Sequence, residues 1–435
     1  MANTYLQKSA FGSANQKTYT ISFWSKLATS TTGNVLAFFD GTNYVRLFFE
    51  NGALKIKSVV SSATKFDIKT NRLFRDFSSW YHFVIAMDTT QATASNRIKF
   101  YVNGVQETSF STATYPDQNY DTDANNALKI GYNGSDNYFD GVLSHFHYID
   151  GTAYDASAFG STDATTGEWK INTSPSVTYG SGGFLILKDG NTITDQSSNS
   201  NDFSLGGGTL TKTEDNPSNV FCTLNPLDNY WCNGTFAYGN TRITTDTTKF
   251  GYNTGTLGAS SGKWYWEMKL AQAVTSGDYH VVGVASVHPF DQEGLGYRAG
   301  GYAYQGEQGN KRINGSQTSY GSAWSTNDII GIAMDLDNKK LYFSKNNVWQ
   351  NSSVPTSGST GTGAISLTQD GFYYPAVSDH AGGLYSAGIF DFNFGNGYFG
   401  TTAVASAGTN ASGNGIFEYD TPTGFTALST KGLNL

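Results

Sequence analysis

The sequence predicts an all-β protein built from two docked antiparallel β-sandwiches. Three observations carry this prediction. Apolar runs are short and bounded by Gly, Asn, Asp or Ser, and the chain holds 50 glycines. We find no window that spaces its apolar residues with helical period over three turns. Finally, a chain of 435 residues is longer than the chains that usually fold around one hydrophobic core, so we expect two domains.

The first strands alternate in polarity. TYLQKS predicts an edge strand, and in KTYTISFWSKL the residues Tyr19, Ile21 and Phe23 alternate with small polar ones, which is typical of a strand with one face on a core. NVLAFFD and NYVRLFFE are separated by a short hairpin loop. GALKIKSVV continues the meander with its two lysines opposite its apolar residues.

Further strands complete the first domain, which we assign to residues 1–212. WYHFVIAMD is apolar enough to be central, and RIKFYVNGVQETSF predicts a hairpin with Asn103 and Gly104 at positive φ. ALKIGYNG, YFDGVLSHFHYIDG and GGFLILKDG supply three more strands. Residues 157–176, rich in Ser, Thr, Gly and Pro, predict an excursion over the surface.

Residues 213–232 predict an ordered connector, because their apolar side chains need a surface to pack against. We assign residues 233–435 to a second β-sandwich. Its expected strands include KWYWEMKLA, YHVVGVASV, GYAYQG, DIIGIAMDLD, KLYFSKNN, FYYPAVSD and SAGIFDFNFG.

The first domain resembles the concanavalin A-like, laminin-G-type family. The resemblance is carried by YTISFWSKL, WYHFVIAMDTTQATASNRIKFYVNGVQ, LKIGYNG and YFDGVLSHFHYIDG, and it covers about residues 1–212. The variety found in tailed-phage virion proteins is especially similar, because a segment like IDGTAYDASAFGSTDATTGEWK follows the sandwich there. The resemblance implies a jelly-roll sandwich.

The second domain resembles the SPRY family through GKWYWEMKL, VVGVASV, NDIIGIAMDLDNKKLYFSKN, FYYPAVSD and FNFG. The resemblance implies a bent β-sandwich used for protein recognition. The sequence departs from the family at Asn347, where Gly usually follows the Asn of the turn; Asn tolerates the left-handed conformation, so we expect the turn to survive. The order of the two domains resembles that of marine-phage virion proteins.

Composition excludes several classes of function. A net charge of -8 argues against a phosphate-binding surface, so we expect no nucleic-acid partner. No apolar stretch is long enough to span a bilayer, and we expect neither membrane insertion nor a signal peptide. Two cysteines, Cys222 and Cys232, have no metal-ligand spacing; a single bridge and two thiols are both open, and two thiols are favoured.

We expect no catalytic residues. Retaining glycosidases need two carboxylates about 5 Å apart, and no strand carries the Glu-x-Asp-x-x-Glu pattern of the hydrolases with this fold. Asp335 and Asp337 have the right spacing, but they follow a strand, where Asp commonly opens a turn.

Two segments offer candidate metal ligands, but the expected cofactor is none, with calcium as the alternative. His145 and His147 lie two residues apart, but no third ligand is suggested, so we interpret them as solvent-facing partners of polar groups. The acid-rich loop YPDQNYDTDANN makes Asp117, Asp121 and Asp123 candidate calcium ligands, with a solvated loop as the favoured alternative.

Aromatic loops suggest a glycan platform in the second domain. Aromatic faces beside amide and guanidinium donors are what sugar rings stack on, and Tyr at strand positions packing into the core is the alternative. The candidate residues are Tyr297, Arg298, Tyr302, Tyr304, Gln305 and Tyr320. Trp264 and Trp266, by contrast, predict core packing, as do Trp24, Trp80 and Trp324.

Together these interpretations predict a non-enzymatic structural protein exposed on a tailed-phage virion. We expect a tail fibre or knob adhesin made in the host cytoplasm, with other virion proteins and a host-surface glycan or receptor as partners, and a homo-oligomeric state in the particle. The alternative is a capsid or head decoration protein without a receptor role. A polysaccharide-degrading enzyme is the least favoured hypothesis.

The tetrapeptide IAMD occurs twice, at residues 85–88 and 332–335. The distance from its Asp to the Asn of the following turn differs between the copies, which argues against a simple duplication. We expect each copy to end a buried strand, with Asp88 and Asp335 holding turns rather than performing catalysis.

Overall fold

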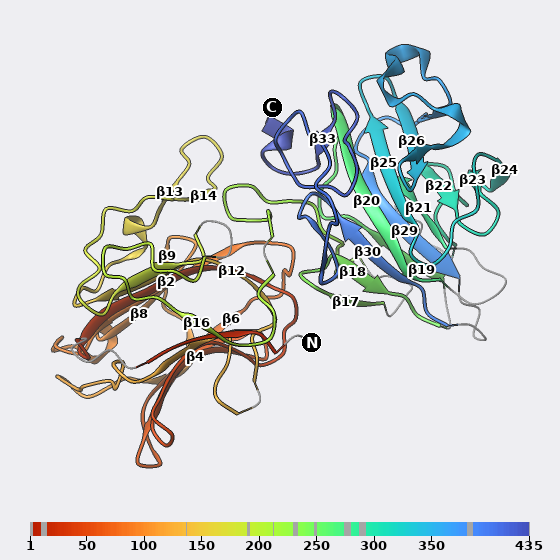
Figure 1. The fold of residues 1–435 in the computed structure, drawn as a ribbon. Helices are drawn as coiled ribbons and strands as arrows, with labels where there is room; N and C mark the ends of the chain where they lie inside the picture. The colour runs from red at the N-terminus through yellow and green to blue at the C-terminus, as the bar shows by residue number, and fades with distance from the viewer. Residues whose placement is uncertain are drawn as a thin grey trace. The chain divides into compact units, whose positions relative to one another are not determined.

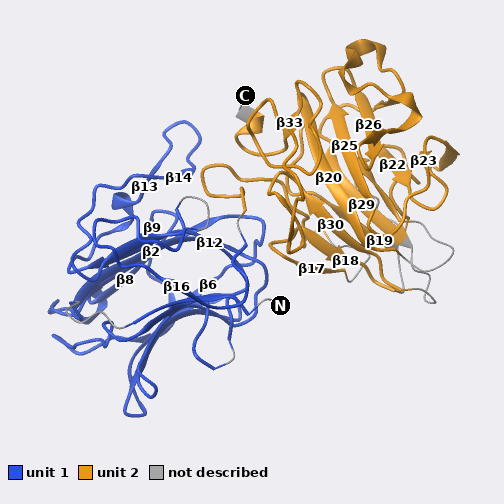
Figure 2. Cartoon of the chain, viewed as in Figure 1, with its two compact units in different colours: residues 1–212 blue, residues 213–435 orange. Residues whose placement is uncertain are grey.

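The structure is a computed structural model, and it separates into two compact units, residues 1–212 and 213–435 (Figure 2). The residues that it describes are 3–9, 15–135, 137–188, 192–211, 213–228, 234–247, 250–273, 280–286, 293–380 and 386–434. Within these ranges the helices are 3-10 turns, and every other regular element is a β-strand (Figure 1). The all-β prediction is confirmed.

The first unit pairs an eight-stranded sheet with a six-stranded sheet. The larger sheet has the order β10-β6-β5-β4-β3-β11-β1-β16. Its strands are β1 (Tyr5–Lys8), β3 (Gly33–Phe39), β4 (Tyr44–Glu50), β5 (Ala53–Val60), β6 (Ala63–Leu73), β10 (Phe110–Thr114), β11 (Leu128–Ile130) and β16 (Ser204–Gly207).

The smaller sheet has the order β15-β12-β2-β7-β8-β9, and β13 pairs with β14 beside it. Its strands are β2 (Thr18–Leu27), β7 (Tyr81–Asp88), β8 (Ile98–Val102), β9 (Val105–Glu107), β12 (Gly141–Asp150) and β15 (Phe184–Ile186). The two-stranded element consists of β13 (Gly160–Thr162) and β14 (Trp169–Ile171). Turns η1 (Ala94–Asn96) and η2 (Ala156–Ala158) also belong to this unit.

The two sheets of the first unit share one aromatic core. Phe23 and Phe83 on the smaller sheet stack on each other, and the Phe83 ring meets that of Phe49 on β4 at 5.5 Å between centroids. The predicted hairpin is confirmed, because Asn103 and Gly104 have φ of 47° and 82°. β7 is central as expected, but the edge-strand prediction for TYLQKS is wrong. β16 arrives from 200 residues later in the chain and pairs with the outer side of β1.

The second unit also consists of two main sheets. The nine-stranded sheet follows the order β17-β18-β30-β20-β25-β26-β27, with β28 paired to β26 and β33 paired in parallel to β20. Its strands are β17 (Thr235–Ala237), β18 (Arg242–Thr244), β20 (Lys263–Gln272), β25 (Ile329–Asp335), β26 (Lys340–Lys345), β27 (Val348–Trp349), β28 (Ile365–Ser366), β30 (Ile389–Asn393) and β33 (Thr426–Ala427).

The six-stranded sheet of this unit has the order β19-β29-β21-β22-β23-β24. Its strands are β19 (Phe250–Thr254), β21 (Val281–Ala285), β22 (Gly301–Gln305), β23 (Asn310–Ile313), β24 (Ser316–Ser319) and β29 (Tyr374–His380). The remaining elements are β31 (Tyr398–Phe399), β32 (Thr402–Ala403) and the turns η3 (Gln350–Ser352), η4 (Pro355–Thr360) and η5 (Gly432–Asn434).

Tryptophans fill the second core, as predicted. Trp266 is fully buried and Trp264 and Trp324 are nearly so, in one cluster with Tyr304 and Phe343. Phe221 and Leu224 of the predicted connector are also buried within this unit. Cys222 is buried beside them, while Cys232 lies outside the described residues, so the state of the cysteine pair stays a prediction.

Both copies of IAMD end a buried strand and begin a turn. The Asp88 carboxylate accepts hydrogen bonds from Thr90 and Gln91, and the Asp335 carboxylate accepts two from Asn338. Lys263 Nζ lies 3.0 Å from Asp335 Oδ2 and balances this buried charge. The turn-holding role predicted for the two aspartates is confirmed.

Candidate ligand-binding face

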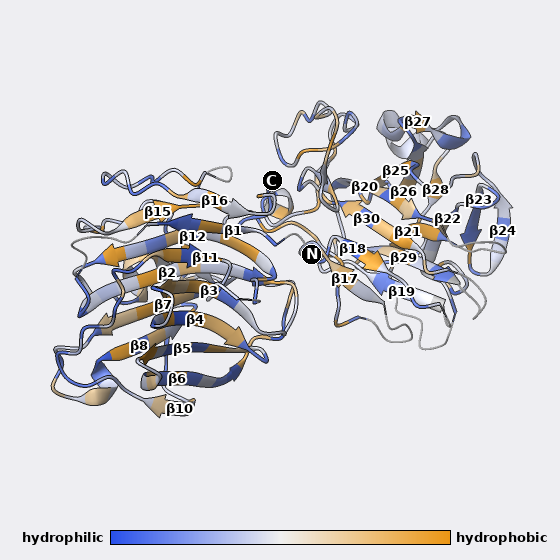
Figure 3. Cartoon of the chain, turned by 60° about the horizontal axis from the view of Figure 1, so that its bottom comes forward, coloured by the Kyte–Doolittle hydropathy of each residue, from blue (hydrophilic) through white to orange (hydrophobic). Residues whose placement is uncertain are grey.

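The outer face of the eight-stranded sheet gathers basic side chains. Along β4 and β5 every second residue lies in the core, so the intervening Arg46, Lys55 and Lys57 point away from it. Figure 3 shows hydrophilic stretches on β5, β6 and β11. We use the name basic face for a set of seven half-buried side chains on this surface. They are Tyr44, Arg46, Phe48, Lys55, Lys57, Lys69 and Lys129.

The charge of this sheet is opposite to that of the whole chain. The sheet carries two acidic residues, Glu50 and Asp67, whereas the chain has a net charge of -8. Its basic residues are Lys8, Arg46, Lys55, Lys57, Lys65, Lys69, Arg72 and Lys129. Positive charge is therefore concentrated on one sheet of the first unit.

Strand pairing aligns outward side chains into a row across the sheet. Each member is the cross-strand partner of the next, so all of them share one face. The row runs through Lys57, Arg46, the fully buried Ala37, Lys129, Gln7 and Ser204, and beyond Lys57 it meets Asp67 on β6. Neighbouring strands lie about 4.8 Å apart, so six strands give a row about 24 Å long.

Ion pairs hold one end of the basic face. Lys55 Nζ lies 3.6 Å from Glu50 Oε2 and 3.3 Å from Asp67 Oδ2. Lys69 donates a 2.8 Å hydrogen bond to Glu50, and this bond lowers the pKa of the Glu50 carboxyl below its usual value. Glu50 is therefore ionised at neutral pH, and its role is to position lysines.

Aromatic rings accompany two cations within the row, Arg46 and Lys129. The Arg46 guanidinium lies 3.9 Å from the ring centroid of Tyr44. Two strands further along the row, the Lys129 ammonium lies 5.1 Å from the Tyr132 centroid and 5.8 Å from that of Tyr5. Tyr132 in turn stacks on Tyr138, with 4.4 Å between centroids. These distances are those of cation–π contacts, which fix the cations beside flat aromatic surfaces.

Glycines make room for Tyr5 next to the row. A side chain at Gly206 or Gly207 of β16 would clash with the Tyr5 ring. The late strand β16 can therefore pair with β1 only because it carries glycine there. This pairing brings Ser204 to the end of the row.

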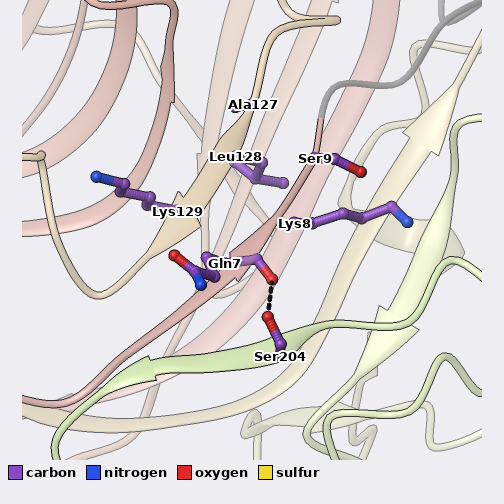
Figure 4. A pocket seen from close by; sticks show the side chains of 7 residues that line it. All are labelled: Gln7, Lys8, Ser9, Ala127, Leu128, Lys129 and Ser204. Atoms are coloured by element: carbon purple, nitrogen blue, oxygen red, sulfur yellow. Dashed lines mark hydrogen bonds between the residues drawn. The ribbon is translucent and has the colours of Figure 1, made fainter.

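A shallow hollow of about 290 Å³ lies at the same end (Figure 4). Ser204 donates a hydrogen bond to the Gln7 carbonyl at 3.3 Å, and the ammonium groups of Lys8 and Lys129 extend in opposite directions. The remaining lining residues are Ser9, Ala127 and Leu128. The hollow offers hydroxyl, amide and ammonium groups, but no carboxylate.

The glycan platform predicted in the second unit does not form. Tyr302, Tyr304 and Tyr320 are at most 3% exposed. β22 turns the rings of Tyr302 and Tyr304 into the core, and Tyr320, which follows β24, packs there against Tyr304. Gln305 is fully buried and bonds to Gln317. The alternative of core packing explains the three tyrosines, since an apolar strand position favours burial over display.

The other two residues of that prediction remain near the surface. The half-buried Tyr297 ring lies beneath the Arg312 guanidinium, 4.1 Å from its centroid. Arg298 is exposed and pairs with Glu293 at 3.0 Å. Two residues without the buried tyrosines give no extended stacking surface.

The three candidate calcium ligands do not assemble into a site. Asp121 lies 3.9 Å from Lys17 Nζ, and the Asp117 and Asp123 carbonyls accept backbone bonds that close turns. Burial and the charges of Asp40 and Asp121 raise the pKa of Asp123, and no cation-binding arrangement compensates. Across the described ranges, no three His, Cys, Asp or Glu side chains are placed to hold a metal. The donor set therefore does not fit calcium.

His145 and His147 are buried, so their interpretation as solvent-facing residues is wrong. β12 changes register between Ser144 and His147, and His145 has a φ of 46°. His145 bonds to Ser144 and His147 to the Tyr179 hydroxyl. The predicted surface excursion, which includes β13 and β14, covers this side of the smaller sheet.

Two buried carboxyls were missed from the sequence. Burial raises the pKa of Glu267 to about 7, and its carboxylate accepts bonds from the backbone N–H groups of Glu418 and Tyr419 and from Asn393. Burial likewise raises the pKa of Asp379 to about 7, and that carboxylate accepts bonds from Thr245 and the Gly388 N–H. Both carboxyls form hydrogen bonds with segments that are distant in the chain. A local sequence pattern cannot predict such contacts.

Comparison with known families agrees with these two folds. Residues 1–153 match the model of the concanavalin A-like lectin/glucanases superfamily, and residues 263–394 match that of the SPRY domain. The chain is a concanavalin A-like domain followed by a SPRY domain. The basic face belongs to the concanavalin A-like domain, and the buried Glu267 belongs to the SPRY domain.

Individual relatives cover parts of the chain. The E3 ubiquitin-protein ligase RKP of Arabidopsis thaliana is 34% identical over 118 residues, which are 27% of this chain and 8% of that protein. The SPRY domain of human HERC1 is 19% identical with a TM-score of 0.31, and the match covers 39% of this chain and 96% of the other. The SAP-like pentraxin of Limulus polyphemus is 16% identical with a TM-score of 0.28, covering 35% and 72%.

No helix in the described parts of the chain has the length and apolar character needed to cross a membrane.

Proposed function

We propose that the chain is a non-enzymatic recognition protein whose first unit binds its target through the basic face. On the resemblance of its domain order to phage virion proteins, we further propose that it lies on the outside of a tailed-phage particle and contributes to host attachment. The observation that carries the recognition role is the alignment of cations and aromatic rings along one sheet of an otherwise acidic chain.

The electrostatics of this face favour binding over hydrolysis. A glycosidase acting there needs a carboxyl group that stays protonated near neutral pH as its general acid. The acids on the strands of this sheet are Glu50 and Asp67; the first has a lowered pKa, and both lie against lysines. The carboxyls with a pKa of about 7, Glu267 and Asp379, are buried and bonded to backbone.

Electron cryomicroscopy of the intact particle tests the attachment role. The proposal expects the chain at a position where the basic face reaches the outside. A location without contact to the outside would overturn attachment and favour the alternative of a capsid or head decoration protein.

Binding of the purified chain to host cells provides a second readout. The proposal expects saturable binding that weakens as salt rises, because exposed charges are screened. Binding to virion proteins alone, with none to cells, would contradict it.

A further inference from the structure

We propose that the target of the basic face is an acidic polysaccharide, a linear glycan bearing carboxylate or sulfate groups, that lies across the strands along the row from Lys57 to Ser204. This inference rests on the proposed function and names the chemical class of its ligand.

The spacing of the cations fits an extended polyanion. Lys57 and Arg46 are adjacent in the row, while Arg46 and Lys129 are separated by the small residue Ala37. With strands about 4.8 Å apart, the three cations lie at about 0, 5 and 14 Å along the row. A chain with anionic groups along its length can contact Arg46 and Lys129 without bending, whereas Lys57 at the start of the row also lies 3.8 Å from Asp67 Oδ2.

Groups beside the cations suit sugar rings. Tyr44 lies against Arg46, and Tyr132, which is itself stacked on Tyr138, lies against Lys129, so aromatic side chains flank both charged positions. Beyond Lys129 the row continues with the Gln7 amide and the Ser204 hydroxyl, which can bond to sugar hydroxyls. The combination of charge, stacking surface and neutral hydrogen-bonding groups distinguishes a glycan from a simple anion.

The charge balance favours a polysaccharide over nucleic acid. Glu50 and Asp67 already engage the cations at the β6 end, so the row offers few charges for the dense phosphates of a nucleic acid. Single-stranded DNA is therefore an informative competitor.

Affinity electrophoresis of the full chain tests the inference. Native gels would contain alginate, dextran sulfate, neutral dextran or single-stranded DNA at matched mass. Two double variants would be compared, Arg46→Gln with Lys129→Gln on the row, and Lys170→Gln with Lys339→Gln as a control. The control changes net charge equally at exposed cations that pair with Asp163 and Asp370. Circular dichroism confirms that each variant is folded.

We expect retardation by alginate or dextran sulfate, none by dextran, and weaker retardation by DNA. The row variant should lose about tenfold or more in affinity, because it removes two cations that form charge-assisted contacts with the polymer. The control should lose less than about twofold. Equal losses in both variants, stronger binding to DNA, or absence of binding to either acidic polymer would overturn the inference. Host-cell binding that persists after such a failure would leave the proposed function standing with a different ligand.

Discussion

Trp169 donates its indole N–H to Nδ1 of His82 at 3.0 Å, and so ties the excursion after β12 to the middle of the smaller sheet. The indole is a donor only, so Nδ1 must carry a lone pair and the proton sits on Nε2, which bonds to Ser22 at 2.9 Å. A second proton on the imidazole would sit on Nδ1 and point at the indole N–H of Trp169, so that two donors would face each other. The ring stacks on Trp169, and a side chain at Gly104 would clash with that indole.

Protonation of His82 should therefore destabilise the first unit. Burial, with the nearby charge of His145, lowers the pKa of His82 to about 3, while the unfolded side chain has an ordinary value near 6.5. The unfolded state thus binds the additional proton first, and stability is lost as pH falls from about 6.5 toward 3. We expect a slope of up to about 1.4 kcal/mol per pH unit from this residue. Urea unfolding across this pH range measures it.

The control for that measurement is His82→Gln, which cannot titrate but keeps an acceptor for Trp169 and a donor for Ser22. Its stability should fall less steeply with acid than that of the parent chain. Parallel pH profiles for the two proteins would show that His82 does not carry the acid sensitivity.

Glu267 should give the opposite dependence on pH in the second unit. Its folded pKa of about 7 exceeds the ordinary value of 4.5 because the carboxyl is buried. The folded state holds the proton longer, so this contribution is fully present below about pH 4.5 and is lost as pH rises through 7. Between pH 5 and 7 the free energy of unfolding should decline by up to about 1.4 kcal/mol per unit.

Replacing Glu267 by Gln should flatten that decline and also destabilise the unit. The amide nitrogen would face donors such as the N–H groups of Glu418 and Tyr419, and an unmet buried donor costs about 1 to 3 kcal/mol. Denaturation at pH 5 and pH 8 separates the two effects. An unchanged pH slope in the variant would assign the decline to another group.

Trp266→Ala should lower the stability of the second unit by about 3 to 5 kcal/mol, because it empties a large volume in a fully buried position. The unfolding midpoint of this unit should fall, and the basic face in the other unit should keep its affinity. An unfolding midpoint equal to that of the parent chain would contradict the assignment of Trp266 to the core.

The turn between β26 and β27 offers a matched pair of substitutions. Asn346 and Asn347 both have positive φ, at 46° and 67°. Asn347→Gly should stabilise the unit by several tenths to about 1 kcal/mol, because glycine has no steric cost there. Asn346→Gly should destabilise it instead, since the Asn346 side chain bonds to the Ile329 N–H and to Asp328. Thermal unfolding compares the two; shifts of the same sign would refute this explanation of the turn.

Local patterns predicted much of the fold. The alternation in GALKIKSVV placed Lys55 and Lys57 on the outer face, and the Asn-Gly pair at residues 103–104 predicted its turn. Both patterns depend on neighbours in the chain. The separation of the two units near residue 212 is also visible in the structure, whereas their docking stays a prediction.

Local patterns could not predict which distant segments of the chain pair or pack together. Nothing near TYLQKS indicates that β16 covers its outer side, and nothing in SHFHYID shows that the later excursion buries its histidines. The candidate site failed for the same reason. The aromatic pattern around Tyr302 and Tyr304 is equally compatible with display and burial, and β22 lies inside a sheet. The row became visible only when six strands were placed side by side.

We propose that the basic face binds a polysaccharide without cleaving it. The most direct measurement incubates the full chain with alginate or dextran sulfate and records both the binding of the protein to the polymer and the length of the recovered polymer by size-exclusion chromatography. The account predicts salt-sensitive retention, its loss in the Arg46→Gln and Lys129→Gln double variant, and a polymer of unchanged length. Shortened polymer chains, or undiminished retention of the double variant, would contradict it.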